Sequence, residues 1–232
     1  MPFNRNPAFW FFSLVVTLLL FEATHIDVAT QQLLYFSESD RWLINRDNDL
    51  LNTIFYSGLK LVLFFGAALL LTAFFLSTKV CGLTSHRKAL KVVLLSLLLA
   101  PTTILALKST TNIACPRALT EFGGDIPYVR LFEAYPSNAM PTRRQRCFPA
   151  GHASGGFAFM SLALLFRKRR HQIGAFLSAA LLGWLMGFYK MAIGDHFLSH
   201  TLVSMEISAI VISVLNYYVN PSSISPVKNP SI

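Results

Sequence analysis

Six long apolar runs dominate the sequence and leave few folds open to it. They cover residues 8–22, 54–76, 89–107, 151–166, 173–193 and 198–219. A run of about 20 apolar residues can cross the hydrocarbon core of a bilayer as a helix. Backbone polar groups in lipid must be paired within the structure, which favours helices over open sheets. The sequence therefore predicts an all-α integral membrane bundle of about six transmembrane helices.

The composition agrees with a membrane protein. Charged residues make up only 13% of the chain, whereas they make up about a quarter of an average soluble domain. We expect one transmembrane domain over residues 1–220 and a short disordered cytoplasmic tail, rich in Pro and Ser, over residues 221–232. The first apolar run could instead be a signal segment, because Arg5 precedes it.

Lys and Arg in the short loops predict the orientation, because cytoplasmic loops are enriched in these residues. The loop after the second run carries Lys79, Arg87 and Lys88, and the loop after the fourth run reads RKRR. Both loops should be cytoplasmic. Both termini would then lie inside, and the outer segments would be residues 23–53, 108–150 and 194–197.

The outer segment 108–150 departs from this charge rule, since it holds six basic residues. Such a segment usually has another use for its cations. We exclude nucleic-acid binding, because no basic domain with interleaved aromatic residues lies outside the predicted spans. The same segment contains Cys115 and Cys147, which could form a disulfide in an oxidising periplasm or remain free thiols.

Polar side chains gather at the predicted outer ends of three helices. Lys108 ends the third apolar run, His152 begins the fourth, and Lys190 and His196 lie where the fifth passes into the sixth. Ionisable groups at such positions are costly and tend to mark functional sites. We therefore expect these residues to converge on one site at the outer face.

The residue types at this face suit a phosphate. Lys108, Arg117 and Lys190 are cations, and Gly151 lies at a helix start whose free N–H groups would also favour an anion. His152 and His196 add groups that titrate near neutral pH and can act as general acid and nucleophile. The pattern therefore indicates phosphate chemistry and not only phosphate binding.

Three motifs lie in this region: KSTTNIACPR at 108–117, PAGH at 149–152 and YKMAIGDHFLSH at 189–200. Their order and spacing resemble the membrane-bound type 2 phosphatidic acid phosphatases, which share an active site with vanadium haloperoxidases. The first motif of that superfamily is Lys, six residues, Arg-Pro, and the second is Pro-Ser-Gly-His. The third is Ser-Arg, five residues, His, three residues, Asp.

The resemblance implies a six-helix fold and a lipid phosphatase that uses no cofactor and no metal. His196 would attack phosphorus and form a phosphohistidine, and His152 would protonate the leaving oxygen and later activate water. Lys108, Arg117 and Lys190 would bind the phosphate. By the same resemblance, the enzyme would lie in a bacterial inner membrane with its site at the periplasmic face. Candidate substrates are undecaprenyl pyrophosphate, lipid A phosphate, phosphatidylglycerol phosphate and phosphatidic acid.

Each motif also departs from the family pattern. Arg117 stands one place late, Ala150 replaces the serine of the second motif, and Lys190 replaces an arginine. His200 replaces the aspartate that orients the nucleophilic histidine. If the sixth span begins near His196, residue 200 lies one helical turn away, and a neutral His200 could accept the imidazole N–H of His196. Asp195 should point elsewhere.

Two other functions fit the same residues. His196 and His200 have the spacing of two metal ligands on one helix and could form a zinc hydrolase site with His152 and Asp195. Alternatively, the cations could serve an anionic-lipid binding or transport protein without catalysis. For the segment 125–136, aromatic residues at helical spacing indicate an interfacial helix beside the site, with a mobile loop as the alternative.

Overall fold

The computed structural model describes residues 6–220, so the tail predicted over 221–232 lies outside the described residues. The chain is mostly helical, with one short antiparallel hairpin of strands Tyr35–Phe36 (β1) and Arg41–Trp42 (β2). The α-helices are Ala8–Ala23 (α1), Ile26–Gln32 (α2), Asp49–Asn52 (α3), Leu59–Leu76 (α4), Cys81–Thr84 (α5), Arg87–Thr110 (α6), Gly151–Ala158 (α7), Arg169–Ala192 (α8) and Leu198–Val219 (α9). A π-helical segment, Thr53–Gly58, joins α3 to α4, and 3-10 helices cover Pro116–Ala118, Thr120–Phe122 and Phe159–Leu165.

The prediction of an all-α membrane bundle is confirmed. Within residues 6–220, four helices are long and apolar enough to cross a bilayer: Asp49–Leu76, α6, α8 and α9. A fifth span results if α1 and α2, which are bent by 73° relative to each other, are taken together. The fourth predicted run forms a shorter apolar helix, Gly151–Leu165, so the count of six stays a prediction.

Helix α9 is the centre of the bundle and α4 lies at its edge. α9 packs against α1, α6, α7 and α8, whereas no residue of α4 is buried. Apolar side chains of α7 and α9, such as Phe157 and Ile212, form part of the core. The carboxylate of Glu206 in α9 accepts hydrogen bonds from Ser13 and Thr17 of α1. This pairing satisfies a carboxylate oxygen that would be costly to leave unpaired in lipid.

Small residues allow α7 and α8 to approach closely. A Cβ atom added to Gly156 would lie 2.7 Å from the backbone of Gly183. Small residues at helix contacts are typical of membrane bundles, where close backbone packing replaces the hydrophobic effect. The contact fixes the start of α7, which carries His152, relative to the end of α8, which carries Lys190.

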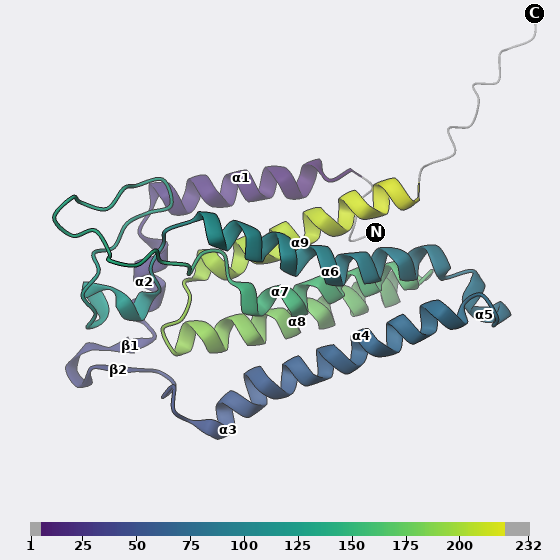
Figure 1. Cartoon of the computed structure of the whole chain (residues 1–232), viewed down its shortest axis with the longest axis horizontal. Coiled ribbons are helices and arrows are strands. Elements are labelled where there is room, and N and C mark those ends of the chain that lie inside the picture. The colour runs from purple at the N-terminus through teal and green to yellow at the C-terminus, as the bar shows by residue number, and fades with distance from the viewer. Residues whose placement is uncertain (1–5, 221–232) are drawn as a thin grey trace, which may run out of the picture.

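Most of the irregular chain gathers at one end of the bundle. Figure 1 shows the hairpin, α2 and the teal loops that follow α6 at the left, together with the turn between α8 and α9. The connections through α5 and between α7 and α8 lie at the opposite end. This is the grouping that the predicted topology requires, because the three outer segments share one face.

One expectation for this end is wrong. Residues 125–136 form no helix, because the backbone of Ile126 instead pairs with Ala118 and Thr120 in an extended bridge. Val129 and Tyr135 are buried in the core, so the segment is a packed irregular loop. Helix α9 begins at Leu198, as the sixth apolar run predicts, so the nucleophile candidate lies in the turn just before the helix.

Candidate active site

A cavity of about 430 Å³ opens where the helix ends meet the loops. Its wall combines four cations, one carboxylate and two histidines with a few neutral side chains. The lining residues are Arg46, Asn52, Tyr56, Lys108, Cys115, Arg117, His152, Tyr189, Lys190, Ile193, Asp195 and His196. The structure therefore brings together the predicted residues Lys108, Arg117, His152, Lys190 and His196.

His196 is buried at the back of this cavity. Its Nδ1 lies 3.5 Å from Nδ1 of His200, and its buried Nε2 has no hydrogen-bond partner among the described residues. Burial, and then the nearby His200 and Lys108, hold the pKa of His196 well below its usual range. His196 is therefore a neutral imidazole near pH 7, with one nitrogen oriented by a neighbour and the other available for chemistry.

A tight turn after α8 places His196. The N–H groups of Asp195 and His196 both donate to the carbonyl of Lys190, and Gly194 adopts a φ of +76°. The ring of Trp42 lies against Gly194, and a Cβ there would be 2.5 Å from it. Both the positive φ and this close approach require glycine. The backbone N–H of Arg117 donates to the Gly194 carbonyl at 3.0 Å, which joins the first motif to this turn.

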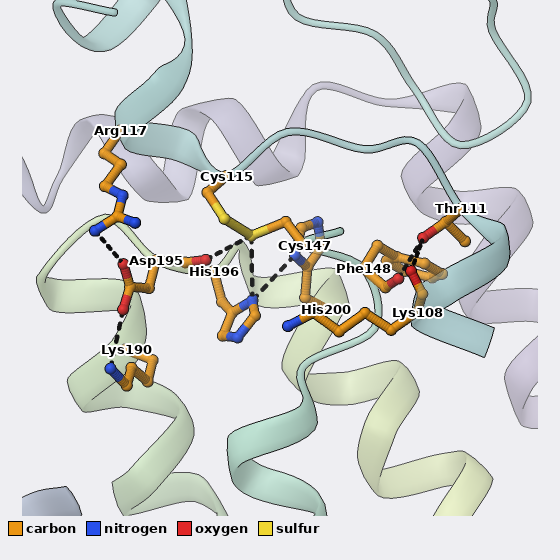
Figure 2. The surroundings of a disulfide bond; sticks show 10 residues. All are labelled: Lys108, Thr111, Cys115, Arg117, Cys147, Phe148, Lys190, Asp195, His196 and His200. Atoms are coloured by element: carbon orange, nitrogen blue, oxygen red, sulfur yellow. Dashed lines mark hydrogen bonds and ion pairs between the residues drawn. A yellow bond between two sulfur atoms is a disulfide. The ribbon is translucent and has the colours of Figure 1, made fainter. Parts of the chain in front are cut away.

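Asp195 bridges two of the predicted phosphate ligands, so its carboxylate pairs with cations and, as expected, does not orient His196. One carboxylate oxygen lies 2.9 Å from Nη1 of Arg117, and the other lies 2.9 Å from Nζ of Lys190 (Figure 2). The expectation assumed that Asp195 lies on a helix, whereas it lies in the turn. Lys108 has no ion pair within residues 6–220 and extends toward His196 (Figure 2).

The second motif is held against α9 through its backbone. The N–H of Ala150 donates to the carbonyl of His200 at 3.0 Å, and the Ala150 carbonyl accepts from the hydroxyl of Ser204. These bonds do not involve the side chain of residue 150, so alanine satisfies them. Gly151 begins α7, does not line the cavity, and has open space where a Cβ would stand.

Cys115 and Cys147 form a disulfide in the structure. The Sγ atom of Cys147 lies 3.6 Å from Nδ1 of His196 and 2.7 Å from the carbonyl oxygen of Asp195 (Figure 2). A disulfide sulfur carries no proton, so both are packing contacts. The disulfide thus joins the ends of segment 108–150 and packs against the turn that carries the nucleophile candidate.

The donor set bears on the alternative of a zinc site. Ligand atoms of Cys147, His196 and His200 lie within 4.8 Å of one another. Zinc binds a cysteine as the thiolate, and the disulfide removes that thiolate. Both oxygens of Asp195 are already paired with cations. The four cations around the cavity favour an anion over a divalent metal ion.

Three lining residues lie outside the sequence region of the three motifs: Arg46, Asn52 and Tyr56. They come from the segment before α4, which carries none of the motifs. The sequence feature that could have indicated Tyr56 is its position, since it lies at the predicted outer end of the second apolar run, at the same predicted depth as His152. Hydropathy alone does not show that this helix end faces the cavity.

The basic residues of segment 108–150 have identifiable roles. Arg117 lines the cavity. The guanidinium of Arg144 donates to the carbonyls of Thr110 and Thr111 at the end of α6, where a cation also complements the helix dipole. Arg130 pairs with Glu133. These contacts explain part of the positive charge on segment 108–150.

Comparison with known proteins points in one direction. The model of a family described as the PAP2 superfamily matches residues 89–223, more than half of the chain and all three motifs. No curated protein and no solved structure matches the chain.

Proposed function

The chain belongs to the PAP2 superfamily, and on this premise we propose that it removes a phosphate monoester or pyrophosphate group from a membrane lipid without using a metal. Membership supports a phosphatase-type function. One observation carries the finer proposal: the buried Nε2 of His196 is unpartnered among the described residues and belongs to a side chain lining a cavity with Lys108, Arg117 and Lys190.

The reaction has two steps. The lone pair of His196 Nε2 attacks phosphorus as the bond from phosphorus to the leaving oxygen breaks, and His152 protonates that oxygen. Water then attacks the phosphohistidine, His152 takes a proton from it, and the P–N bond breaks. The ring centroids of the two histidines are 5.8 Å apart, so both can reach groups on one phosphorus atom.

His200 takes the place of the family aspartate. Its ring donates a hydrogen bond to the backbone carbonyl of Cys147. A neutral imidazole has one N–H, so its other nitrogen remains free to accept the proton on His196 Nδ1. His200 therefore fixes the tautomer that leaves the Nε2 lone pair of His196 free, although it stabilises a positive charge less than a carboxylate does.

Arg117, Lys190 and Lys108 bind the phosphate in this scheme. The incoming phosphate replaces the Asp195 carboxylate on Arg117 and Lys190 and adds contacts to Lys108. Because Asp195 already holds Arg117 and Lys190 near the cavity, the substrate meets cations whose side chains are ordered in advance. Gly151 begins α7 but does not line the cavity, so it has no contact with the phosphate in this scheme.

The predicted topology gives the setting of the reaction. Long apolar helices make the chain an integral membrane protein, and we propose a bacterial inner membrane with both termini in the cytoplasm. The cavity would then face the periplasm, where a disulfide is stable. The proposed substrates are undecaprenyl pyrophosphate, lipid A phosphate, phosphatidylglycerol phosphate and phosphatidic acid.

The test is phosphate release by the purified protein from these four lipids in the presence of EDTA. We expect release from at least one lipid, and loss of it in His196→Ala and in His152→Ala. His171→Ala, at the exposed start of α8, is the matched control and should keep the wild-type rate. Loss of activity in EDTA with rescue by zinc would support the metal alternative. No release from any lipid by folded protein would support binding or transport alone.

A further inference from the structure

Tyr56, which has no part in the two steps above, lies against the side chain of His152. Its hydroxyl oxygen lies 3.3 Å from His152 Nδ1, and the two rings meet edge to face at 5.1 Å. Tyr56 belongs to the π-helical segment Thr53–Gly58, and such π-helical turns are frequent at functional sites. The arrangement gives His152 a partner on the nitrogen opposite Nε2.

Two lysines complete the surroundings of Tyr56. The ammonium group of Lys60 donates to the Tyr56 oxygen at 2.6 Å, and Nζ of Lys190 lies 4.4 Å from the centre of the Tyr56 ring. An ammonium group can only donate hydrogen bonds. The oxygen of Tyr56 is therefore the acceptor from Lys60, and its own proton is free for another partner.

Within residues 6–220, the acceptor in reach of that proton is His152 Nδ1. A His152 that accepts at Nδ1 carries its single proton on Nε2. Lys60 and Lys190 also oppose a positive charge on the His152 ring. The geometry thus favours a neutral His152 with the proton on Nε2, which is the form that must protonate the leaving oxygen.

We propose that Tyr56, supported by Lys60, forms a proton relay with His152, an inference that rests on the proposed function. In the first step, the leaving oxygen takes the proton from His152 Nε2 while His152 Nδ1 takes the proton of Tyr56. The ring stays neutral, and the Tyr56 phenolate is paired with the ammonium group of Lys60. No imidazolate or imidazolium forms on His152.

The second step reverses the relay. His152 now carries its proton on Nδ1 and has a free lone pair on Nε2. That lone pair takes a proton from the attacking water as the P–N bond to His196 breaks, and the Nδ1 proton returns to Tyr56. Tyr56 is therefore a positioning residue that sets the tautomer of His152 for each step, and all protons are restored after one turnover.

The test is Tyr56→Phe, which keeps the ring and removes the hydroxyl. It is assayed on a short-chain phosphatidic acid, whose alcohol leaving group needs a proton, and on p-nitrophenyl phosphate, whose leaving group does not. On phosphatidic acid we expect kcat to fall about 100-fold, a typical contribution of general acid–base catalysis, with little change in KM. On the aryl phosphate we expect the burst of the first p-nitrophenolate per site to keep its wild-type rate, because this leaving group departs without a proton from the relay.

Three controls separate the relay from a structural role. Lys60→Met should lose rate on phosphatidic acid, and Lys60→Arg, which restores a donor to the Tyr56 oxygen, should recover much of that loss. Tyr217→Phe changes an exposed tyrosine near the end of α9 and should change neither rate. Phosphate release measured in mixtures of H₂O and D₂O should indicate two moving protons in the wild type and fewer in Tyr56→Phe.

The outcomes are distinct. A Tyr56→Phe protein with wild-type rates on both substrates, or with an equal loss on both and no burst, would overturn the relay while leaving the proposed function intact. A folded wild-type protein that releases no phosphate from any substrate would overturn the proposed function, and the relay with it.

Discussion

The Nδ1 atoms of His196 and His200 lie 3.5 Å apart, although His196 precedes α9 and His200 lies within its first turn. The turn at Gly194 and the contact with the disulfide bring His196 back over the helix start. A histidine thus occupies the place, relative to the nucleophile candidate, that the family pattern gives to an aspartate. The first prediction concerns this pair.

Two substitutions of His200 should have different effects on kcat. His200→Ala removes the acceptor for the His196 N–H, and we expect kcat to fall by about 100-fold, with KM nearly unchanged because His200 does not line the cavity. His200→Asp restores a carboxylate, which stabilises the charged phosphohistidine better, and should equal or exceed the wild-type kcat. A His200→Ala protein with full activity would show that another group orients His196.

The carboxylate of Asp195 competes with phosphate for Arg117 and Lys190. In Asp195→Asn both ion pairs are lost, so the cations become free for an anion. We expect inorganic vanadate and phosphate to inhibit about tenfold more tightly, corresponding to about 1.4 kcal/mol. Asp125→Asn, in the loop between α6 and α7, is the control. Weaker inhibition in Asp195→Asn would instead mean that Asp195 mainly holds the cations in place.

Much of the fold and part of the site could be predicted from the sequence, for different reasons. Apolar runs locate the helices because lipid admits few other structures. Polar residues at helix ends located Lys108, His152, Lys190 and His196, because ionisable groups at such positions are costly.

What could not be predicted depends on the path of the irregular chain around the cavity. Asp195 reaches Arg117 and Lys190 because Gly194 turns the backbone before α9 begins. Tyr56 and Arg46 enter the site because the segment before α4 folds back against α8, where Ile44 donates to the Ala192 carbonyl. Neither contact leaves a periodic signal in the sequence.

The low pKa of His196 predicts how activity depends on pH. Its cause is burial first, and then the nearby His200 and Lys108. Since the nucleophile must be neutral, activity is lost only when the pH falls below this lowered pKa. The acidic limb of kcat/KM should therefore lie below pH 6.5, the ordinary value for histidine. In the unfolded chain His196 binds a proton near pH 6.5, whereas in the folded protein it does so only at lower pH. The free energy of unfolding should therefore also fall as the pH drops below 6.5. An acidic limb at or above pH 6.5 would contradict the assignment of His196.

The disulfide should contribute both to stability and to the geometry of the nucleophile. Cys115 and Cys147 are 32 residues apart, and closing a loop of that size stabilises the folded state by about 3 to 4 kcal/mol on the chain-entropy model. We expect the free energy of unfolding of the Cys115→Ser/Cys147→Ser double variant in detergent to be lower by that amount. The variant should therefore unfold at a lower denaturant concentration. Its kcat should fall at a temperature where it remains folded, because Cys147 no longer packs in the same way against His196.

Thiol reductant should lower the wild-type rate and leave the rate of the double variant unchanged. Cys81→Ser, which removes an exposed free cysteine, is the control and should change neither measurement. Equal reductant sensitivity of the wild type and the double variant would show that the disulfide does not support the site.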